Sequence, residues 1–435
     1  MKRRSTQGKS RREESGSFIR TASSRLPPPG SALLVVGSVF LVLSGVAGLA
    51  LGAELARPGL GFLSLSRYDD LLADHAVYAV YLGLWPLAVG AALAVVRTGR
   101  VLGAAGAGLV IAGGVVVYDA LRRQATFAYG WTSYAPTTAL SHLERVEREL
   151  AIGMALALVG LLCAALPLVG RRSPLAAAVA ASAGVLPFLV AAQVAQAADA
   201  FWNTPRHVAW AAVVLPAVGA AGEVVARATG RPLPTLYGAG LAAFVLVAAT
   251  VWLEHTIRAR FGESGWESTA LAVPVALAVA AVLAAAATRG APPTLPILFA
   301  AAAILQLVAG GALGAWVAAQ DPSLHWMDTQ LVNAHLHLAL LGGLCGLLAL
   351  AHAEPRFDPR LGAATLALLV AGTGTFAAAE AVAGHSRMPR RVADYAPQFA
   401  DVNLAATIGG ALTAVALLLF AANCAQAARR PRRRR

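Results

Sequence analysis

The chain has 435 residues, of which 58% are hydrophobic and only 13% are charged, a composition that excludes a soluble globular protein and is typical of an integral membrane protein. The formal net charge is +13. The basic residues lie in the two tails and in alternate loops, and this placement argues against nucleic acid as a partner.

Apolar runs of about 20 residues predict the membrane-spanning helices. Residues 1–30 are expected to form a disordered basic tail, and residues 428–435 a second basic tail. Between them we predict one all-α polytopic membrane domain, residues 31–427, with about twelve transmembrane helices. The predicted helices are 31–53, 73–96, 99–119, 148–169, 174–197, 206–226, 236–257, 268–288, 293–317, 329–351, 361–380 and 402–427.

Loops rich in arginine alternate with loops of mixed charge, and the arginine-rich loops are expected on the cytoplasmic side. An even number of helices places both termini on that side of the cell membrane, where the basic tails either contact anionic lipid or are solvated. The arginines of these loops are Arg97, Arg100, Arg171, Arg172, Arg227, Arg231, Arg289, Arg356 and Arg360. The outer loops are predicted at 54–74, 122–149, 201–206, 258–267, 321–328 and 380–401.

Five of the nine histidines are predicted at one depth, near the outer ends of the spans. Imidazole ligates haem iron, non-haem iron and copper, and helical bundles build metal sites from side chains on facing helices. The alternative is five separately hydrogen-bonded histidines that line a polar pathway. These residues are His75, His207, His255, His335 and His337.

His335 and His337 stand two residues apart at the start of the predicted helix 329–351. Successive residues of an α-helix are about 100° apart, so the two side chains are predicted to point about 200° apart. Each imidazole can therefore serve a different partner.

Glu254 directly precedes His255 near the end of an apolar run. A carboxylate in this position needs a partner. It either binds a metal together with His255, at a distorted helix end, or forms an ion pair with Arg258, four residues on.

Several short segments carry a further signal: AELARPG with DHAVYAVYLGLWP, GWTSYAP, FWNTPRHVAWAAVVLPAVG, WLEHT, DTQLVNAHLHLAL and MPRRVADYAPQFADVNL. In this order, and at these helices, they resemble the catalytic subunit of the haem–copper oxidase superfamily over residues 31–427. That superfamily includes cytochrome oxidases (subunit I) and nitric oxide reductases (large subunit).

The resemblance implies a bundle that holds two haems, which we expect to be b-type. His75 and His337 match the two axial ligands of a low-spin, electron-transferring haem. His335 matches the single axial ligand of a high-spin haem. These sites are expected toward the outer face of the membrane.

The resemblance also implies a distal metal, either non-haem iron or copper. His207 and His255 match two of its ligands, and Glu254 stands where a third histidine is usual. Glu254 is then a metal ligand or a local proton carrier, and we expect it to be the catalytic carboxylate.

A loop near the outer surface completes the expected haem sites. Arg390 and Arg391 match an arginine pair that binds haem propionates, and Asp328 lies near the same region. The expected electron donor is an outer-side cytochrome c, blue-copper protein or quinol. A small accessory subunit and the lipid bilayer are the other expected partners.

Several positions depart from the oxygen-reducing pattern of the superfamily. Ala211 replaces the usual tyrosine, Ala209 a proton-carrying glutamate, and Ala278 the lysine of a proton path. A proton needs ionisable groups, hydroxyl groups or water to cross hydrocarbon. Glu223 is the one exception noted on the inner half, so proton pumping from the cytoplasm is not expected.

These features lead to two functional hypotheses. The first is a terminal reductase that passes electrons through a low-spin haem to a high-spin haem and metal, where NO or O2 is reduced. The second is a haem-binding electron-transfer or gas-sensing membrane protein of the same fold that does not turn over.

Overall fold

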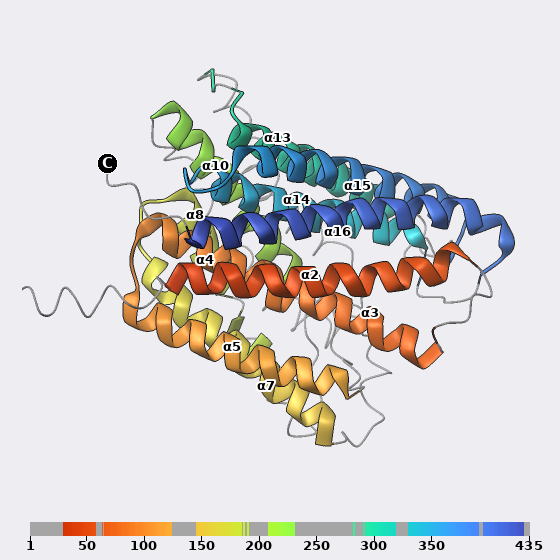
Figure 1. Ribbon diagram of the computed structural model, residues 1–435, viewed down its shortest axis with the longest axis horizontal. Coiled ribbons are helices and arrows are strands. Elements are labelled where there is room, and N and C mark those ends of the chain that lie inside the picture. The colour runs from red at the N-terminus through yellow and green to blue at the C-terminus, as the bar shows by residue number, and fades with distance from the viewer. Residues whose placement is uncertain are drawn as a thin grey trace, which may run out of the picture.

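The structure is a computed structural model, and in the part that it describes the chain is almost entirely helical, which confirms the predicted all-α class (Figure 1). The described residues are 29–57, 63, 65–123, 145–184, 186–187, 189–190, 208–230, 282, 290–291, 293–318, 329–390 and 395–429. The predicted helices 236–257 and 268–288 lie outside these residues, except for Val282, so the full count of twelve stays a prediction.

The described helices follow the predicted spans in order. The first are α2 (Pro29–Ala56), α3 (Leu65–Ala79), the π-helical turn η1 (Val80–Leu84), α4 (Trp85–Val96), α5 (Arg100–Arg122), α7 (Arg145–Ala165), the 3-10 turn η2 (Leu166–Leu168) and α8 (Pro174–Ala183). The others are α10 (Val208–Thr229), α13 (Leu295–Ala318), α14 (Gln330–His352), α15 (Pro359–His385), the 3-10 turn η5 (Pro397–Phe399) and α16 (Ala400–Arg429).

Within the described residues, 8 helical segments are long and apolar enough to cross a membrane. Each overlaps one predicted span, with ends that differ by a few residues. α14 packs against α10, α13 and α15, while α16 packs against both α15 and α2 (Figure 1). The sequence therefore folds into a bundle in which α14, the helix of His335 and His337, is surrounded by other helices.

The second predicted span is continuous but not uniformly α-helical. Pro86 lies at the start of α4, and a proline ring clashes with the carbonyl group four residues before it, here that of Leu82. The chain relieves this clash by the π-helical turn η1, where the backbone N–H of Trp85 donates to the carbonyl of Val80. This turn lies between His75 and the core residue Trp85.

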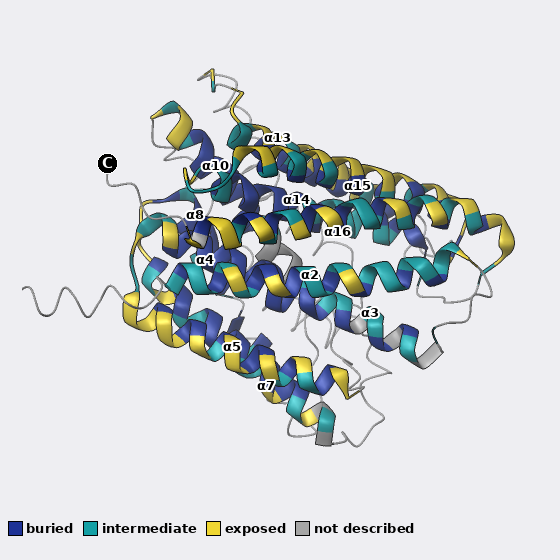
Figure 2. Cartoon of the chain, in the orientation of Figure 1, coloured by how far each residue is buried: buried dark blue, intermediate teal, exposed yellow. Residues whose placement is uncertain are grey.

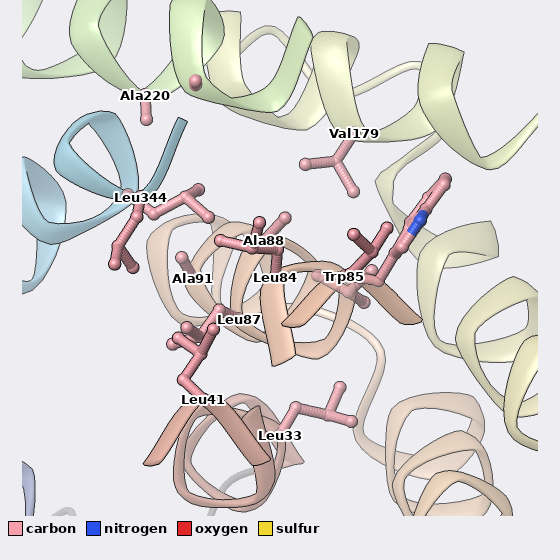
Figure 3. Packing of buried hydrophobic residues seen from close by; sticks show 14 of the residues in the cluster. Leu33, Leu41, Leu84, Trp85, Leu87, Ala88, Ala91, Val179, Ala220 and Leu344 are labelled. Carbon is pink, nitrogen blue, oxygen red and sulfur yellow. The ribbon is translucent and has the colours of Figure 1, made fainter. Parts of the chain in front are cut away.

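Apolar side chains from several helices meet around α4 (Figure 3). Leu33 and Leu41 of α2 approach it from one side, and Val179 of α8, Ala220 of α10 and Leu344 of α14 from the other. Trp85 is 1% exposed at the centre of this cluster. Large side chains such as Val101 and Leu305 instead point outward from the bundle, as expected for surfaces that face lipid (Figure 2).

The described beginning and end of the chain lie at the same end of the bundle. Ser38 of α2 contacts Cys424 of α16 at 3.8 Å, and Thr407 of α16 donates to the carbonyl of Gly52 at the opposite end. α2 and α16 are therefore antiparallel. Arg171 also donates to Thr98, which joins two of the arginine-rich loops.

The outer end of α15 differs from the prediction, because the predicted outer loop 380–401 begins inside a helix. Residues 380–385 continue α15, since Glu, Ala and Val are compatible with a helix, no proline interrupts the stretch, and Gly384 comes only one residue before its end. Glu380 is consequently a buried side chain, 4% exposed, rather than a loop residue. The loop itself is held in place by the antiparallel bridge between Thr329 and Pro389.

Trp85 should contribute strongly to the stability of the bundle. Trp85→Ala is expected to lower the free energy of unfolding by about 3–5 kcal/mol, because it leaves a cavity in the apolar cluster around α4. Trp85→Phe should cost less, since the indole Nε1 has no hydrogen-bond partner in the described structure. Denaturant unfolding in detergent measures both, with the exposed Val101→Ala as a control; equal effects of Trp85→Ala and Val101→Ala would contradict this account.

Candidate functional site

Two imidazoles face each other across the interface between α3 and α14. The ring centroids of His75 and His337 are 6.0 Å apart, and the ring planes are 22° from parallel. Phe376 of α15 contacts the ring of His337 at 4.3 Å between centroids. The second and tenth of the predicted spans thus bring together two residues that are 262 positions apart in the sequence, His75 and His337.

Both of these rings are held by a backbone carbonyl at Nδ1. His75 Nδ1 lies 2.9 Å from the carbonyl oxygen of Ser44, and His337 Nδ1 lies 2.9 Å from that of Asn333. A carbonyl oxygen only accepts hydrogen bonds, so Nδ1 carries the proton and the lone pair is on Nε2. This is the tautomer that a histidine adopts when it ligates a metal through Nε2.

The spacing of the two rings fits one metal ion between them. An ion about 2 Å from each of two Nε2 atoms places the ring centroids about 6 Å apart. The observed separation of 6.0 Å agrees with this value. The two rings are therefore close enough to share one metal ion.

Two small residues of α2, Ser44 and Gly48, hold the ring of His75 in position, and we call such a pair of residues the seat of the ring. Ser44 accepts at its carbonyl, and its hydroxyl group donates to the carbonyl of His75 at 2.9 Å. Gly48 follows one turn later, where a Cβ atom would lie 3.0 Å from Cε1 and 3.1 Å from Nδ1 of the ring. A larger residue at position 48 would displace His75.

His335 occupies a similar seat on α13, on a different side of α14 from His337. Its Nδ1 lies 2.6 Å from the carbonyl oxygen of Gly310. A Cβ atom at Gly314 would lie 2.5 Å from Cε1 of the ring. The two histidines therefore contact different helices, as their spacing predicts, and His335 also carries its proton on Nδ1.

Polar side chains follow His337 toward the N-terminus of α14. Asn333, one turn before His337, donates from its side chain to Gln330 and also interacts with the side chain of Glu380 on α15. Gln330 in turn donates to the carbonyl of Pro389 at 3.4 Å. This network reaches the loop that contains Arg390, which is partly exposed.

Contacts of Met388 fix the position of the loop that contains Arg390. Met388 is 0% exposed and packs with Ala383 and Phe399. Its carbonyl accepts from the backbone N–H of Gln330 at 3.1 Å. Arg390 is thereby held beside the outer end of α14.

Several predicted site residues lie outside the described residues: Asp328, Arg391, His207, Glu254 and His255. Among the residues that the structure describes, no group of three or more His, Cys, Asp or Glu could hold a metal. The distal metal site therefore stays a prediction.

Glu223 is a buried carboxylate on α10, and both of its oxygens accept hydrogen bonds. Glu223 accepts from the hydroxyl group of Ser173 at 2.8 Å and from Nε of Arg227 at 3.1 Å. Because Ser173 also caps the N-terminus of α8, this contact fastens α8 to α10. All three cysteines are free thiols.

Sequence reasoning did not identify the residues that seat the two histidines. Ser44 with Gly48, and Gly310 with Gly314, are pairs of small residues four positions apart on neighbouring helices. Such pairs are common wherever membrane helices pack closely, so the pattern alone does not distinguish a ring seat from ordinary packing.

A family model described as cytochrome c and quinol oxidase polypeptide I matches residues 29–412. Cytochrome c oxidase subunit 1 of Thermostichus vulcanus is 25% identical over 470 residues, which cover 91% of this chain and 82% of that protein. Cytochrome c oxidase subunit 1 of Bacillus subtilis is 25% identical over 452 residues, 90% of this chain and 72% of the relative. A solved heme-copper terminal oxidase dimer superposes with a TM-score of 0.70 at 17% identity, covering 93% of this chain and 84% of that one.

The seat of His335 should tolerate no added methyl group at Gly314. Gly314→Ala is expected to lower the free energy of unfolding by about 1–3 kcal/mol, because the ring of His335 must move. The matched control is Gly311→Ala on the same helix, where a Cβ atom meets nothing within 4 Å.

A double-mutant cycle with His335→Ala separates this clash from a general effect on α13. Truncating His335 should remove most of the penalty of Gly314→Ala. Additive losses in thermal or denaturant unfolding would show that Gly314 does not act through the imidazole.

Proposed function

Since the chain belongs to the cytochrome c and quinol oxidase polypeptide I family, we propose that it is the catalytic subunit of a terminal reductase that reduces NO or O2. By this membership it is a multi-pass membrane oxidoreductase of the haem–copper oxidase type. The observation that carries the proposal is the 6.0 Å pairing of His75 and His337, with both Nδ1 atoms held by backbone carbonyls.

The described residues would each perform a defined task. His75 and His337 would hold a low-spin haem, and His335 a high-spin haem on the other side of α14. The haems, expected to be b-type, would supply one-electron transfer and the reduction of the gas. Ser44, Gly310 and Asn333 fix the ring tautomers, and Gly48 and Gly314 fix the ring positions.

Arg390, with Arg391, is proposed to bind haem propionates. Its place in the loop beside the outer end of α14 supports this role, because the propionates of a haem held by His337 would need a cation nearby. Asp328 is proposed to belong to the same region.

For the distal metal we propose His207, His255 and Glu254 as ligands. Two imidazoles with a carboxylate suit non-haem iron at least as well as copper. Glu254 would also carry a proton locally during reduction of the gas. Ala211 in place of a tyrosine favours NO, whereas the relatives named as cytochrome c oxidases favour O2.

We propose that the haem sites face outward from the cell membrane, with both termini in the cytoplasm. The arginine-rich loops support this orientation, because Arg97 and Arg171 lie at the end of the bundle where α2 begins and α16 ends. Electrons would arrive from an outer-side cytochrome c, blue-copper protein or quinol, with a small accessory subunit as a further partner.

We further propose that the chain does not pump protons from the cytoplasm. The engaged oxygens of Glu223 support this, since they leave that carboxylate in a structural contact between α8 and α10. Ala209 and Ala278 remove two groups that carry protons in the oxidase pattern.

The second candidate is a haem-binding electron-transfer or gas-sensing protein of the same fold that does not turn over. The alanines at positions 209, 211 and 278 favour it, because they remove groups used in oxygen chemistry. Metal analysis separates the two candidates: iron or copper in excess of two haem irons is expected only for the reductase.

The two haem roles can be separated by single substitutions on α14. His335→Ala should remove the haem that reacts with CO and keep the absorbance of the bis-histidine haem. His337→Ala should do the reverse. Reduced and CO-difference optical spectra measure both, with the exposed His385→Ala as a control; full CO binding in His335→Ala would contradict the assignment.

Reconstituted vesicles test the reaction and its proton balance together. With a competent one-electron donor outside, the protein should consume NO or O2 and should take its protons from the outer side. Glu254→Gln is expected to lower the rate at least tenfold, within the range for loss of a positioned proton carrier. Consumption of neither gas would favour the second candidate, and ejection of protons from the vesicle interior would contradict the absence of pumping.

A further inference from the structure

A buried carboxyl group lies one helical turn outward from the contact between α15 and His337. On α15, Phe376 contacts the ring of His337, and Glu380 follows four residues later on the same face. Glu380 meets Asn333, which in turn precedes His337 by four residues on α14. The two antiparallel helices thus present His337 with Phe376, and one turn outward Asn333 with Glu380.

The hydrogen bonding of Glu380 is incomplete. Its side chain is 4% exposed and interacts with the amide of Asn333, while Oε2 has no hydrogen-bond partner among the residues that the structure describes. The same amide also donates to Gln330. A carboxylate buried with one shared donor is poorly stabilised, so its protonation depends strongly on nearby charge.

Few other charges face this carboxyl group from the helices packed against α15. In the described range of α13 there is no titratable side chain, and at this end of α16 there is the exposed Asp401. On α14 the titratable groups nearest to Glu380 are His335 and His337, each with its Nδ1 proton on a carbonyl oxygen, and Cys345 and His352 lie farther along the helix. Beyond α15, His385 and Arg387 are exposed, and Arg390 is partly exposed.

We propose that Glu380 binds a proton when an electron reaches the cofactor held between His75 and His337, and releases it when the electron leaves. This inference rests on the proposed function, which places a haem there. An added electron lowers the local potential, and a carboxylate one turn away in an apolar bundle responds by taking up H⁺.

The reaction is balanced as one electron and one proton. A one-electron donor reduces the cofactor, and the Glu380 carboxylate with one H⁺ becomes a carboxylic acid with a new O–H bond at Oε2. No other bond changes. The proton is proposed to come from the outer side, because the described polar contacts of Glu380 lead through Asn333 and Gln330 to the carbonyl of Pro389.

The pH dependence of the reduction potential tests this coupling in the intact holoprotein. In the wild type, the midpoint potential of the bis-histidine haem should fall as pH rises, by at most about 59 mV for a tenfold change in proton concentration. Glu380→Gln, which keeps a side chain able to accept from Asn333, should lose most of that slope. Glu380→Asp should restore part of it.

The matched control is Glu223→Gln. This carboxylate is similarly buried, but both of its oxygens are engaged and it lies in the inner half of the bundle. The control should keep the wild-type slope. Equal haem content and equal optical spectra establish that the variants hold the same cofactors.

Infrared difference spectra, reduced minus oxidised, give an independent reading. A carboxylic acid C=O band should appear on reduction of the wild type, shift in Glu380→Asp and vanish in Glu380→Gln. An unchanged slope in Glu380→Gln, or a band that persists in that variant, would overturn the inference while the haem assignment stands. A wild-type protein without a bis-histidine haem spectrum would instead overturn the proposed function and this inference with it.

Discussion

The imidazoles of His75, His335 and His337 depend on the same constraint: a polar ring in an apolar bundle must have its N–H group satisfied. Backbone carbonyls of Ser44, Asn333 and Gly310 meet that need for His75, His337 and His335. A helical carbonyl already accepts one hydrogen bond but has a second lone pair, so it can take the imidazole N–H without breaking the helix. The protein thereby fixes each ring tautomer with its main chain. No additional ionisable side chain has to be buried for this purpose.

The small residues of α2 and α13 follow from that arrangement. A ring can reach a carbonyl of a neighbouring helix only if the two helix surfaces come close, and Gly48 and Gly314 allow this approach. The apolar cluster around α4 then holds α2, α8, α10 and α14 in fixed positions (Figure 3). Packing far from the rings therefore controls the distance between them, and the 6.0 Å separation is a property of the whole bundle.

The sequence predicted the spans and the direction of the two histidines of α14 because hydrophobic runs and helical periodicity are local properties. The seats of the rings were not predictable in the same way, since Gly314 meets His335 only after α13 and α14 have packed. Glu380 was placed in a loop, because a charged residue after an apolar run usually marks the end of a span, whereas here α15 continues to His385. The burial of Met388 depends on contacts with Ala383 and Phe399 that no short pattern records. The proposed ligands His207, Glu254 and His255 rest on the resemblance to the family alone.

The π-helical turn η1 makes the length of the second span as important as its composition. Val80–Leu84 holds one more residue than an α-helical turn would between His75 and the core side chain of Trp85. If the same residues formed a regular α-helix, His75 would rotate by about 100° with respect to α4. A regular α-helix with one residue fewer in this segment would instead keep the direction of His75. Related chains that keep the facing pair of rings are therefore expected either to retain a π-helical turn here or to lack one of its residues.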